Sequence, residues 1–376
     1  MKLTNIRLGD YIERSTKNNK NLEYGTDLIS GVNNQGKFTV PKGNTDGVDL
    51  KPYKIVNNGA FVYNPTRLEL GSIAYRTEGL CIVSHLYMVF YLTAEGKKIL
   101  DPTWLYIYFR RSEFCREVTF RNFGSQRPEF NFKDMSDIIV PLPPLHIQKK
   151  YVDIYNAMLE NQKSYERGLE DLKLSFESMI NEYKHKSNKK TVGSILKEID
   201  LRNVDGLITN VQGININKQF MPSIADMHDV DLKKYKIVSN GQFAFSGMQT
   251  GRDECIRIAL FTESEQIVIS PAYTVLKTID ESIYPEYIMM WFSRKEVDRL
   301  GWFMSDASIR TNLDMDRFFE IEIPVPSIEI QKSIVNVFNA YNLRKSINEQ
   351  LKAQIKDICP ILIKGSIEEA QKVKEA

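Results

Sequence analysis

Two stretches of basic, amide and hydroxyl side chains carry the groups that read nucleic-acid bases. One runs from Arg121 to Arg127 in the first half of the 376-residue chain, and the other runs from Ser308 to Asn312 in the second half. Arginine, asparagine and glutamine form paired hydrogen bonds with base edges in a major groove, while other polar groups contact phosphates. We therefore interpret both stretches as candidate DNA contacts; the alternative is that they are ordinary solvated loops.

The full set of candidate DNA contacts is spread over loop-like segments of both halves. In the first half it comprises Lys17, Lys20, Arg67, Arg76, Arg121, Ser125, Gln126 and Arg127. In the second half it comprises Gln249, Arg252, Arg257, Ser308, Arg310 and Asn312. Residues 1–140 hold 19 basic and 15 acidic groups, whereas residues 187–323 hold 16 and 20. DNA binding by the second half therefore needs a local basic patch.

Sequence patterns that support catalysis or metal binding are weak. The segment Tyr63 to Thr66 has one proline where an adenine methyltransferase needs two, and Gly36-Lys37 lacks the spacing of a phosphate loop. The four histidines and four cysteines are scattered, without the paired spacing of a metal site or a disulfide framework. We expect no catalytic site, no metal and no cofactor in this chain.

The chain contains an internal repeat with an offset of about 183 residues. Pro141 to Lys149 (PLPPLHIQK) returns as Pro324 to Lys332 (PVPSIEIQK), and Leu50 to Gly59 returns as Leu232 to Gly241. The repeat predicts a globular domain over residues 1–140, a proline strap with a long helix over 141–188, a second globular domain over 189–323, and a second strap and helix over 324–376.

Each globular domain is predicted to consist mainly of short strands with attached helices. Apolar runs such as 60–63 and 81–84 are separated by turn signals such as Asn57-Asn58-Gly59. One helix is predicted over Pro102 to Glu117, where apolar residues fall near one face. The fold class is therefore α+β, with two β-rich domains separated by two long antiparallel coiled-coil helices in a pseudo-two-fold repeat.

Both long helices carry apolar heptad positions that require a partner helix. From Ile147 to His185 the first would be about 58 Å long at 1.5 Å per residue. The residues predicted to contact the other helix or a partner subunit are Gln148, Tyr151, Tyr155, Met158, Tyr165, Leu169, Leu172 and Phe176 in the first segment and Gln331, Ile334, Phe338, Tyr341, Leu351, Ile355 and Ile358 in the second.

Polar residues interrupt both apolar series. Gln162 lies in the first, and Arg344 and Asn348 lie in the second. They either meet and set the register of the helix pair, or they mark a locally open seam. Pro360 is expected to end or kink the second helix.

These features resemble the specificity subunits of type I restriction-modification systems. The resemblance rests on the repeated strap ending in Ile-Gln-Lys, the long helix after each copy, the duplicated block from Asn57 to Ala74, and Gly124 to Arg127. It implies a non-catalytic chain whose globular parts are target recognition domains, each reading half of a split, asymmetric site in double-stranded DNA. It also implies helices that set the gap and dock two methyltransferase subunits, which would bind S-adenosylmethionine, with restriction and translocase subunits joining that core.

Two alternatives stay open at this stage. One is a coiled-coil adaptor that binds no DNA and has two ligand-binding end domains. The other is the specificity chain of a related enzyme whose methyltransferase and nuclease are fused in another polypeptide. No apolar run approaches 18 residues and the first residues lack the apolar core of a signal peptide, so we expect a cytoplasmic protein without a membrane segment.

Overall fold

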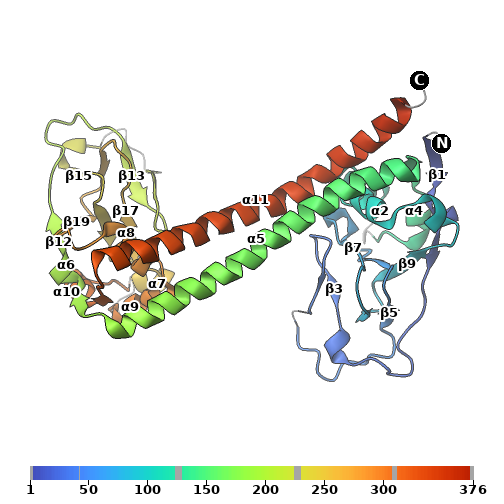
Figure 1. Ribbon diagram of the computed structural model, residues 1–376, viewed down its shortest axis with the longest axis horizontal. Helices are drawn as coiled ribbons and strands as arrows, with labels where there is room; N and C mark the ends of the chain where they lie inside the picture. Colours follow the sequence, from blue (N-terminus) through green and yellow to red (C-terminus); the bar gives the residue numbers. More distant parts are fainter. Residues whose placement is uncertain (1–2, 42, 123–128, 224–229, 307–310, 373–376) are drawn as a thin grey trace. The chain divides into compact units, whose positions relative to one another are not determined.

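The computed structural model describes residues 3–41, 43–122, 129–223, 230–306 and 311–372. It divides into two compact units, one of residues 1–165 with 347–376 and one of residues 166–346. Each unit contains one globular copy of the repeat and about half of each long helix (Figure 1). The mixed helix and strand fold with two repeated domains confirms the predicted fold class.

The strands of the first unit form one main sheet and three smaller pairings. The main sheet has the order β2-β9-β6-β7, from Ile12–Arg14, Met88–Leu92, Phe61–Tyr63 and Ile73–Tyr75. The antiparallel pairs are β3–β4, from Gly31–Val32 and Phe38–Thr39, and β5–β8, from Lys54–Val56 and Cys81–Val83. The proline strap forms β10 (Ile139–Leu142), which pairs antiparallel with β1 (Thr4–Arg7).

The helices of the first unit follow the main sheet. They are α1 (Gly96–Ile99), α2 (Pro102–Phe109), α3 (Ser112–Arg121) and α4 (Phe132–Ser136), with short 3-10 turns η1 (Leu8–Asp10), η2 (Thr26–Leu28) and η3 (Leu68–Leu70). The prediction of one helix over 102–117 is wrong at Arg111, whose extended backbone (φ −72°, ψ 147°) separates α2 from α3. Arg110, at the end of α2, instead donates hydrogen bonds to the carbonyls of Gly71 and Asn34.

The core of the first unit includes both long helices. Phe61, Phe90, Trp104 and Phe109 are fully buried and belong to the same cluster as Tyr155 of α5. Cys359, Leu362 and Ile363 of α11 complete this cluster. The helix pair therefore buries apolar surface against its own globular domain, and burial of this kind is the main driving force for the association.

The second unit repeats the arrangement. Its sheets have the orders β12-β19-β16-β17 and β14-β13-β18-β15, and β20 (Glu322–Pro324), which leads into the second strap, pairs antiparallel with β11 (Lys189–Thr191). The other strands are β12 (Leu196–Ile199), β13 (Val211–Ile214), β14 (Phe220–Pro222), β15 (Lys236–Val238), β16 (Phe243–Ser246), β17 (Arg257–Leu260), β18 (Ile267–Ile269) and β19 (Thr274–Thr278).

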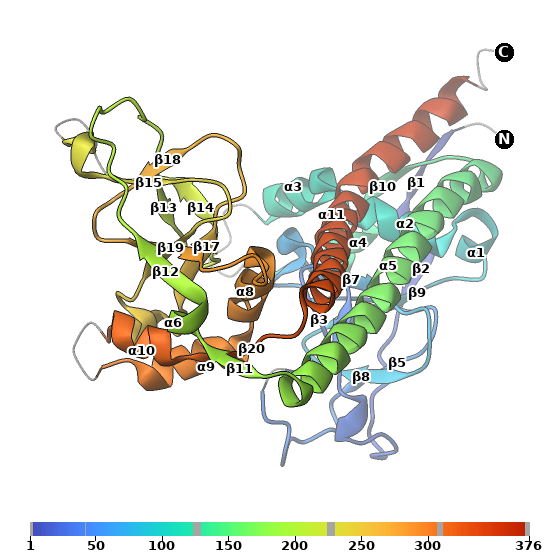
Figure 2. The same cartoon turned by 60° about the vertical axis from the view of Figure 1, so that its left-hand side comes forward.

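Helices gather at one end of the second unit's sheets, where α6, α9 and α10 lie together in both views (Figures 1 and 2). The shorter helical elements are α6 (Val192–Ile195), η4 (Leu232–Lys234), α7 (Thr250–Asp253), α8 (Pro285–Phe292), α9 (Lys295–Met304) and α10 (Met315–Glu320). Helices α8, α9 and α10 correspond to α2, α3 and α4 of the first unit. Duplication of the globular domain is thus visible element by element.

The long helices are α5 (Leu145–Lys186) and α11 (Ile328–Lys372), and they pair antiparallel inside each unit. In the first unit Tyr151 donates to Glu369 while Gln162 donates to Asn348. In the second unit the rings of Phe176 and Phe338 pack at 5.2 Å between centroids. The pairing therefore has the predicted direction.

Two outcomes were predicted at Pro360, an end of the helix or a kink in it. The first is wrong, because helix α11 does not end at this proline. It continues through this proline to Lys372. Ser366 and Ala370 beyond it are buried, and the Ser366 hydroxyl accepts a hydrogen bond of 3.1 Å from the Trp104 ring nitrogen. Packing against the first unit's core thus outweighs the cost of an internal proline, which is about 3 kcal/mol.

Candidate nucleic-acid interface

In the second unit, four of the predicted DNA contacts lie in one cluster. The backbone amide of Gln249 donates to Oδ1 of Asn312 at 3.2 Å, and its side-chain oxygen accepts from Arg257 at 3.2 Å. Arg257 also forms an ion pair with Asp253, and the Arg252 guanidinium donates to the same carboxylate at 3.3 Å. The four side chains come from α7, β17 and the segment before α10, and Asp253 joins the two arginines.

A strained turn positions this cluster. Gln249 and Glu254, which flank α7, both have left-handed backbones, with φ of 63° and 48°. The segment is held by Thr250, which is fully buried, and by the Gly251 amide, which donates to the Thr311 carbonyl at 3.0 Å. Non-glycine residues rarely adopt this conformation, and where they do the surrounding structure must hold it, often at a functional site.

The charges in the cluster are partly neutralised internally. Burial alone would raise the pKa of Asp253, but hydrogen bonds and charge from Arg257 and Arg252 outweigh it, so the net pKa is lowered. Arg257 is largely buried, whereas the Arg252 side chain is 65% exposed. Arg252 is therefore the cation of this cluster that is best placed to contact a phosphate or a base.

The predicted contacts of the first unit lie on separate segments. Arg67 is exposed just before η3, which packs on α3. Arg121, at the end of α3, pairs with Glu117 at 2.8 Å. Arg76 is half-buried and lies over the Phe38 ring at 5.0 Å, and its Nε atom is buried without a hydrogen-bond partner. Lys17 and Lys20 are exposed on a different loop.

The remaining predicted contacts fall outside the described residues. They are Ser125, Gln126, Arg127, Ser308 and Arg310. The helices that precede them are described: α3 leads toward the first group, and α9 leads toward the second.

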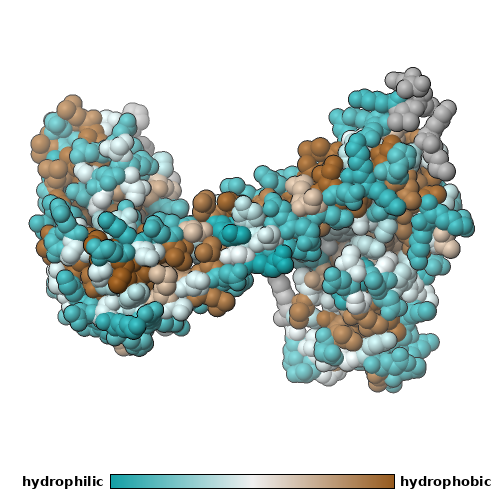
Figure 3. Space-filling view, viewed as in Figure 1, coloured by the Kyte–Doolittle hydropathy of each residue, from teal (hydrophilic) through white to brown (hydrophobic). Residues whose placement is uncertain are grey.

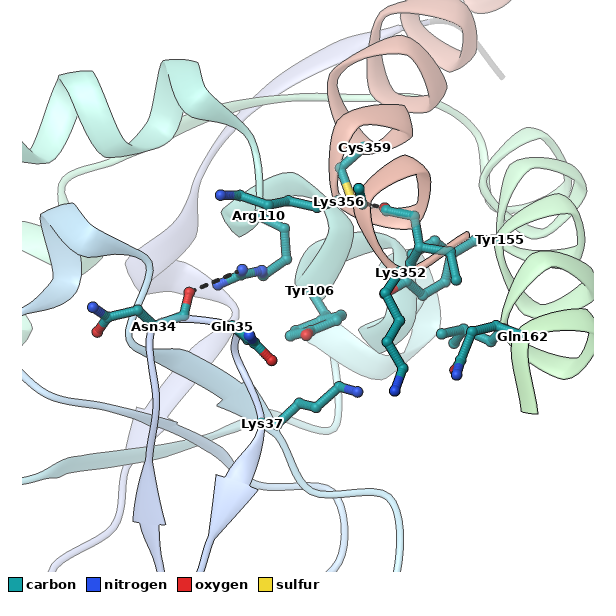
Figure 4. Close-up of a pocket in the computed structure, with 13 residues that line it drawn as sticks. Asn34, Gln35, Lys37, Tyr106, Arg110, Tyr155, Gln162, Lys352, Lys356 and Cys359 are labelled. Atoms are coloured by element: carbon teal, nitrogen blue, oxygen red, sulfur yellow. Dashed lines mark hydrogen bonds between the residues drawn. The ribbon is translucent and has the colours of Figure 1, made fainter. Parts of the chain in front are cut away.

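A basic cleft in the first unit was not anticipated from the sequence (Figure 4). It has a volume of about 300 Å³ and is lined by Lys37, Arg110, Lys352 and Lys356, together with amide and tyrosine side chains and no carboxylate. Lys37 follows a turn of the β3–β4 ribbon, and the other cations come from α2 and α11. The sequence signal at this place is Gly36-Lys37, which lacks the spacing of a phosphate loop. The cleft can hold an anionic group.

The two strap glutamines, predicted as helix or partner contacts, are fully buried at the junction between each globular domain and its helix. The Gln148 amide donates to the carbonyls of Ile99 and Pro143 at 2.8 and 2.7 Å, and its oxygen accepts from the Asp101 amide at 2.8 Å. Gln331 makes the equivalent three bonds to Ser282, Pro326 and Tyr284, at 2.8, 2.8 and 2.9 Å. Both side chains are thus occupied by their own unit.

The other predicted seam residues are buried or half-buried. They are Tyr151, Tyr155, Met158, Tyr165, Leu169, Leu172 and Phe176 in α5 and Ile334, Phe338, Tyr341, Leu351, Ile355 and Ile358 in α11. Part of this burial comes from the globular domains, because Tyr155 and Ile334 belong to the domain cores. The apolar heptad positions therefore pack against a globular domain as well as against the other helix.

The polar interruptions form a specific contact in the first unit. Gln162 and Asn348 are each 4% exposed, and Nε2 of Gln162 donates to Oδ1 of Asn348 at 2.9 Å. This geometry favours the interpretation in which the two residues meet, and not that of an open seam. In the second unit Arg344 lies against Gly168, where a Cβ atom would come within 2.5 Å of the guanidinium.

Two kinds of feature are absent from the described residues. Across residues 3–372, outside the four internal gaps, no three His, Cys, Asp or Glu side chains are grouped so that they could hold a metal. In the same residues, no helix combines the length and the apolar character needed to cross a membrane.

Comparisons with known proteins identify one family that matches this chain. The family described as type I restriction modification DNA specificity domain matches residues 4–173 and 228–357. A comparison with curated protein sequences found no match. The structure of the S subunit of the type I restriction-modification system from M. genitalium is similar, with a TM-score of 0.59, 13% identity, and coverage of 97% of this chain and 96% of that one.

Two further solved structures are less similar. The HsdS subunit from Thermoanaerobacter tengcongensis has a TM-score of 0.44, 14% identity, and coverage of 97% and 96%. A chain from a structure describing assembly and conformational transition of the type I R-M system has a TM-score of 0.49, 14% identity, and coverage of 98% and 97%. Because the matched family covers most of both repeats, the chain belongs to the type I restriction-modification DNA specificity family.

Proposed function

We propose that this chain is the DNA-sequence specificity subunit of a type I restriction-modification complex, in which each globular domain reads one half of a bipartite, asymmetric site. Membership of the family supports the general role. The proposal that the two halves differ rests on the differing candidate contacts. The second unit offers the Gln249–Arg252–Asn312 cluster, whereas the first offers Arg67 and Arg76 on separate segments.

The observation that carries the proposal is the strap glutamine junction. Gln148 and Gln331, at the start of the long helices, each make two hydrogen bonds to the segment before the first core helix, α2 or α8, and a third to a proline carbonyl of their own strap. A junction of this kind fixes the direction of a reader domain relative to its helix. Both long helices contribute to both units, so the pair is suited to hold two readers at a set spacing.

The helices are also proposed to dock the modification subunits, of which the repeat suggests two. Each unit exposes two large apolar side chains on the outer faces of α5 and α11: Ile154 and Ile361 in the first, Leu174 and Leu343 in the second. Exposed apolar residues on a helix shared by two equivalent units are the docking points that we assign to two equivalent subunits. S-adenosylmethionine would then be bound by those subunits, and restriction and translocase subunits would join the assembled core.

Methylation mapping tests the function directly. The chain is co-expressed with the methyltransferase encoded beside it, and methylated adenines are mapped across the host genome by single-molecule sequencing. We expect one split motif with two defined halves and a fixed gap. An assembled, soluble complex that adds no methylation would instead support the adaptor hypothesis, which predicts no steep loss of DNA affinity with rising salt.

A paired insertion tests the role of the helices. Four residues are added after Leu159 in α5 and four after Leu351 in α11, because these positions lie on the same side of the Gln162–Asn348 bond along the antiparallel pair. The added helix is about 6 Å long, and DNA rises about 3.4 Å per base pair, so the gap should lengthen by one or two base pairs. The half-sites should not change.

The control for this insertion is four residues at Gly43, in a loop of the first unit where no atom lies near the position of a Cβ. It should leave both the gap and the half-sites unchanged. Altered half-sites with an unchanged gap in the helix variant would contradict the spacing role. The remaining alternative, a fused methyltransferase-nuclease partner, is decided by the sequences of the neighbouring coding regions.

A further inference from the structure

One phenylalanine is exposed at the same place in each unit. Phe120 is 81% exposed and Phe303 is 83% exposed. Helices α3 and α9 are each ten residues long, and this phenylalanine is the ninth residue of both. A single exposed aromatic side chain needs no special explanation. An exposed phenylalanine at the equivalent position of both units does need one.

The two helices have kept this surface while their buried faces changed. Of ten aligned positions three are identical: Glu113 and Glu296, Arg116 and Arg299, and Phe120 and Phe303. The buried positions differ, since Phe114 and Val118 of α3 correspond to Val297 and Gly301 of α9. If packing inside each unit controlled these helices, the buried residues would be the ones retained. Retention of exposed residues instead points to a partner common to both units.

The retained arginine and phenylalanine lie on one face of each helix. Arg116 precedes Phe120 by four residues and Arg299 precedes Phe303 by four, a spacing that places side chains next to each other along a helix. Both arginines are exposed, and that of Arg116 is 3.6 Å from Glu113. We call each set an Arg–Phe pair. A cation beside an exposed aromatic ring fits a partner with negative charge and flat apolar groups, as in DNA.

The surroundings of the pairs agree with that partner. In the second unit, Gly301 of α9 lies against Ile256 and Thr250, so α9 packs on α7 and its Arg252. A shallow pocket beside Phe303 is lined by Trp302, Ser305, Asp306 and Thr311. In the first unit, α3 packs in the same way on η3, which follows Arg67. The helix that carries each Arg–Phe pair therefore packs on an element beside candidate base-reading residues.

Both units otherwise show a largely hydrophilic visible face with smaller hydrophobic patches (Figure 3). We propose that Phe120 and Phe303 are equivalent wedges, each inserting its ring between bases of its own half-site, with Arg116 and Arg299 contacting the adjacent phosphates. Side chains of this type unstack a base step and bend the duplex. This inference rests on the proposed function and assigns a positioning residue to each half-site.

The test uses the assembled complex with its modification subunits and a duplex carrying its mapped site. The fluorescent base 2-aminopurine is placed in turn along each half-site, because it brightens when it loses its stacking neighbours. Phe120→Ala should abolish the brightening in the half-site read by the first unit only, and Phe303→Ala in the other only. Each should weaken binding about tenfold or more, the usual effect of losing one base–aromatic contact.

Matched controls separate insertion from general surface effects. Leu86→Ala in the first unit and Leu207→Ala in the second remove exposed apolar side chains, 65% and 79% exposed, that lie outside α3 and α9. They should leave fluorescence and affinity unchanged. Arg116→Gln and Arg299→Gln should weaken binding while preserving the brightening and should each lower the salt dependence by about one counterion.

The outcomes are distinguishable. If the phenylalanine variants fail to recruit the modification subunits, the surface docks protein and the wedge is excluded. If they assemble, bind and brighten like the wild type, the wedge is also excluded. Both of these outcomes leave the proposed function intact, whereas a wild-type complex that shows no site-specific binding at all overturns the function itself.

Discussion

In both units a cation joins the turn of a β-ribbon to the end of the first core helix, and we call this place the corner of the unit. The cation comes from the helix in the first unit and from the turn in the second. In the first unit Arg110, at the end of α2, reaches the β3–β4 turn and donates to the carbonyls of Asn34 and Gly71. In the second unit Lys218, in the β13–β14 turn, reaches the end of α8 and donates to the Phe292 carbonyl. Lys218 also forms an ion pair of 2.6 Å with Asp298, and its side chain is only 8% exposed.

The turns themselves are equivalent. The Asn33 amide donates to the Lys37 carbonyl at 3.0 Å, and the Asn215 amide donates to the Gln219 carbonyl at 3.0 Å. Gly36 and Lys218 occupy the same left-handed position, with φ of 73° and 60°. A side chain at Gly36 would meet the Tyr106 hydroxyl at 2.7 Å, so the first unit requires glycine, whereas the second has space for a lysine to pass inward.

This exchange changes the electrostatics of the corner. The second unit buries its cation beside a carboxylate, whereas the first keeps Lys37, Arg110, Lys352 and Lys356 around an open cleft without a carboxylate (Figure 4). The two units thus share the same arrangement of elements at this corner but place their positively charged side chains differently. The difference has the same sign as the basic excess of residues 1–140 and the acidic excess of residues 187–323.

The largest expected effect follows from the buried ion pair. Lys218→Met removes the cation beside the half-buried Asp298, which keeps the hydrogen bond from the Ile256 amide, and should lower the free energy of unfolding of the second unit by about 3–5 kcal/mol. Arg110→Met removes hydrogen bonds at a half-exposed site and should cost the first unit about 1–2 kcal/mol. Urea unfolding followed by pulsed thiol labelling measures both, because Cys255 reports on the second unit and Cys81 on the first.

The control for this pair is Lys234→Met, which removes an exposed lysine of the second unit whose nearest carboxylate is 3.9 Å away. It should change stability by less than about 0.5 kcal/mol. Equal losses for Lys218→Met and Arg110→Met would contradict the conclusion that the two corners are held by different interactions.

A second prediction concerns the strap glutamine junction, which both units share. Gln148→Leu and Gln331→Leu each leave two carbonyls and one amide, at buried or partly buried bonds, without this partner, so each should destabilise its own unit by about 2–3 kcal/mol. The two losses should agree closely, because the bonds are the same in both units. The exposed Gln354→Leu on α11 is the neutral control. A large loss for one variant alone would show that only that junction is structural.

The sequence predicted the features that depend on periodicity and internal similarity. The repeat, the β-rich domains, the two long helices and their antiparallel direction all follow from patterns that recur along the chain. The helix break at Arg111 and the continuation past Pro360 did not, because both are set by tertiary contacts, namely the Arg110 bonds to distant carbonyls and the packing of Ser366 on Trp104.

The candidate site was less predictable for the same reason. Gln249, Arg252, Arg257 and Asn312 could be selected by residue type, but the carboxylate of Asp253 that joins the arginines could not. The repeat marks Gln148 and Gln331 as equivalent positions, but it does not show that their partners are the carbonyls and amides of the globular domain and strap and not the other helix. The exposure of Phe120 and Phe303 has no signature in the sequence, where a phenylalanine near a helix end suggests core.

A third prediction concerns how the stability of the first unit changes with pH. Burial raises the pKa of the Cys359 thiol from about 9 to about 11. The folded state therefore keeps a proton that the unfolded state releases above pH 9, so this stabilisation is complete below pH 9 and is lost as the pH rises toward 11. The stability difference between wild type and Cys359→Ala should shrink by about 1–2 kcal/mol over that range.

Labelling at Cys81 after urea unfolding measures this change, and Cys255 of the second unit is the internal reference. A Cys359→Ala protein whose first unit loses as much stability as the wild type between pH 9 and pH 11 would show that other groups control the alkaline transition.

The smallest expected effect lies in the helix pair, where the units again differ. Gln162 and Asn348 bond each other in the first unit, whereas Arg344 covers Gly168 in the second. Gln162→Leu or Asn348→Leu alone removes the hydrogen bond between these two amides and should cost about 1 kcal/mol, while the double variant should recover that loss or exceed the wild type in stability.

Stability and specificity should therefore separate in this double variant. A single buried polar contact fixes the register of a helix pair because every shifted arrangement leaves its groups unpaired, and two leucines remove that penalty. If the register of α5 against α11 sets the spacing of the two readers, the Gln162→Leu/Asn348→Leu complex should methylate sites with more than one gap length. A single gap, unchanged from the wild type, would mean that the strap junctions and domain cores hold the register without this bond.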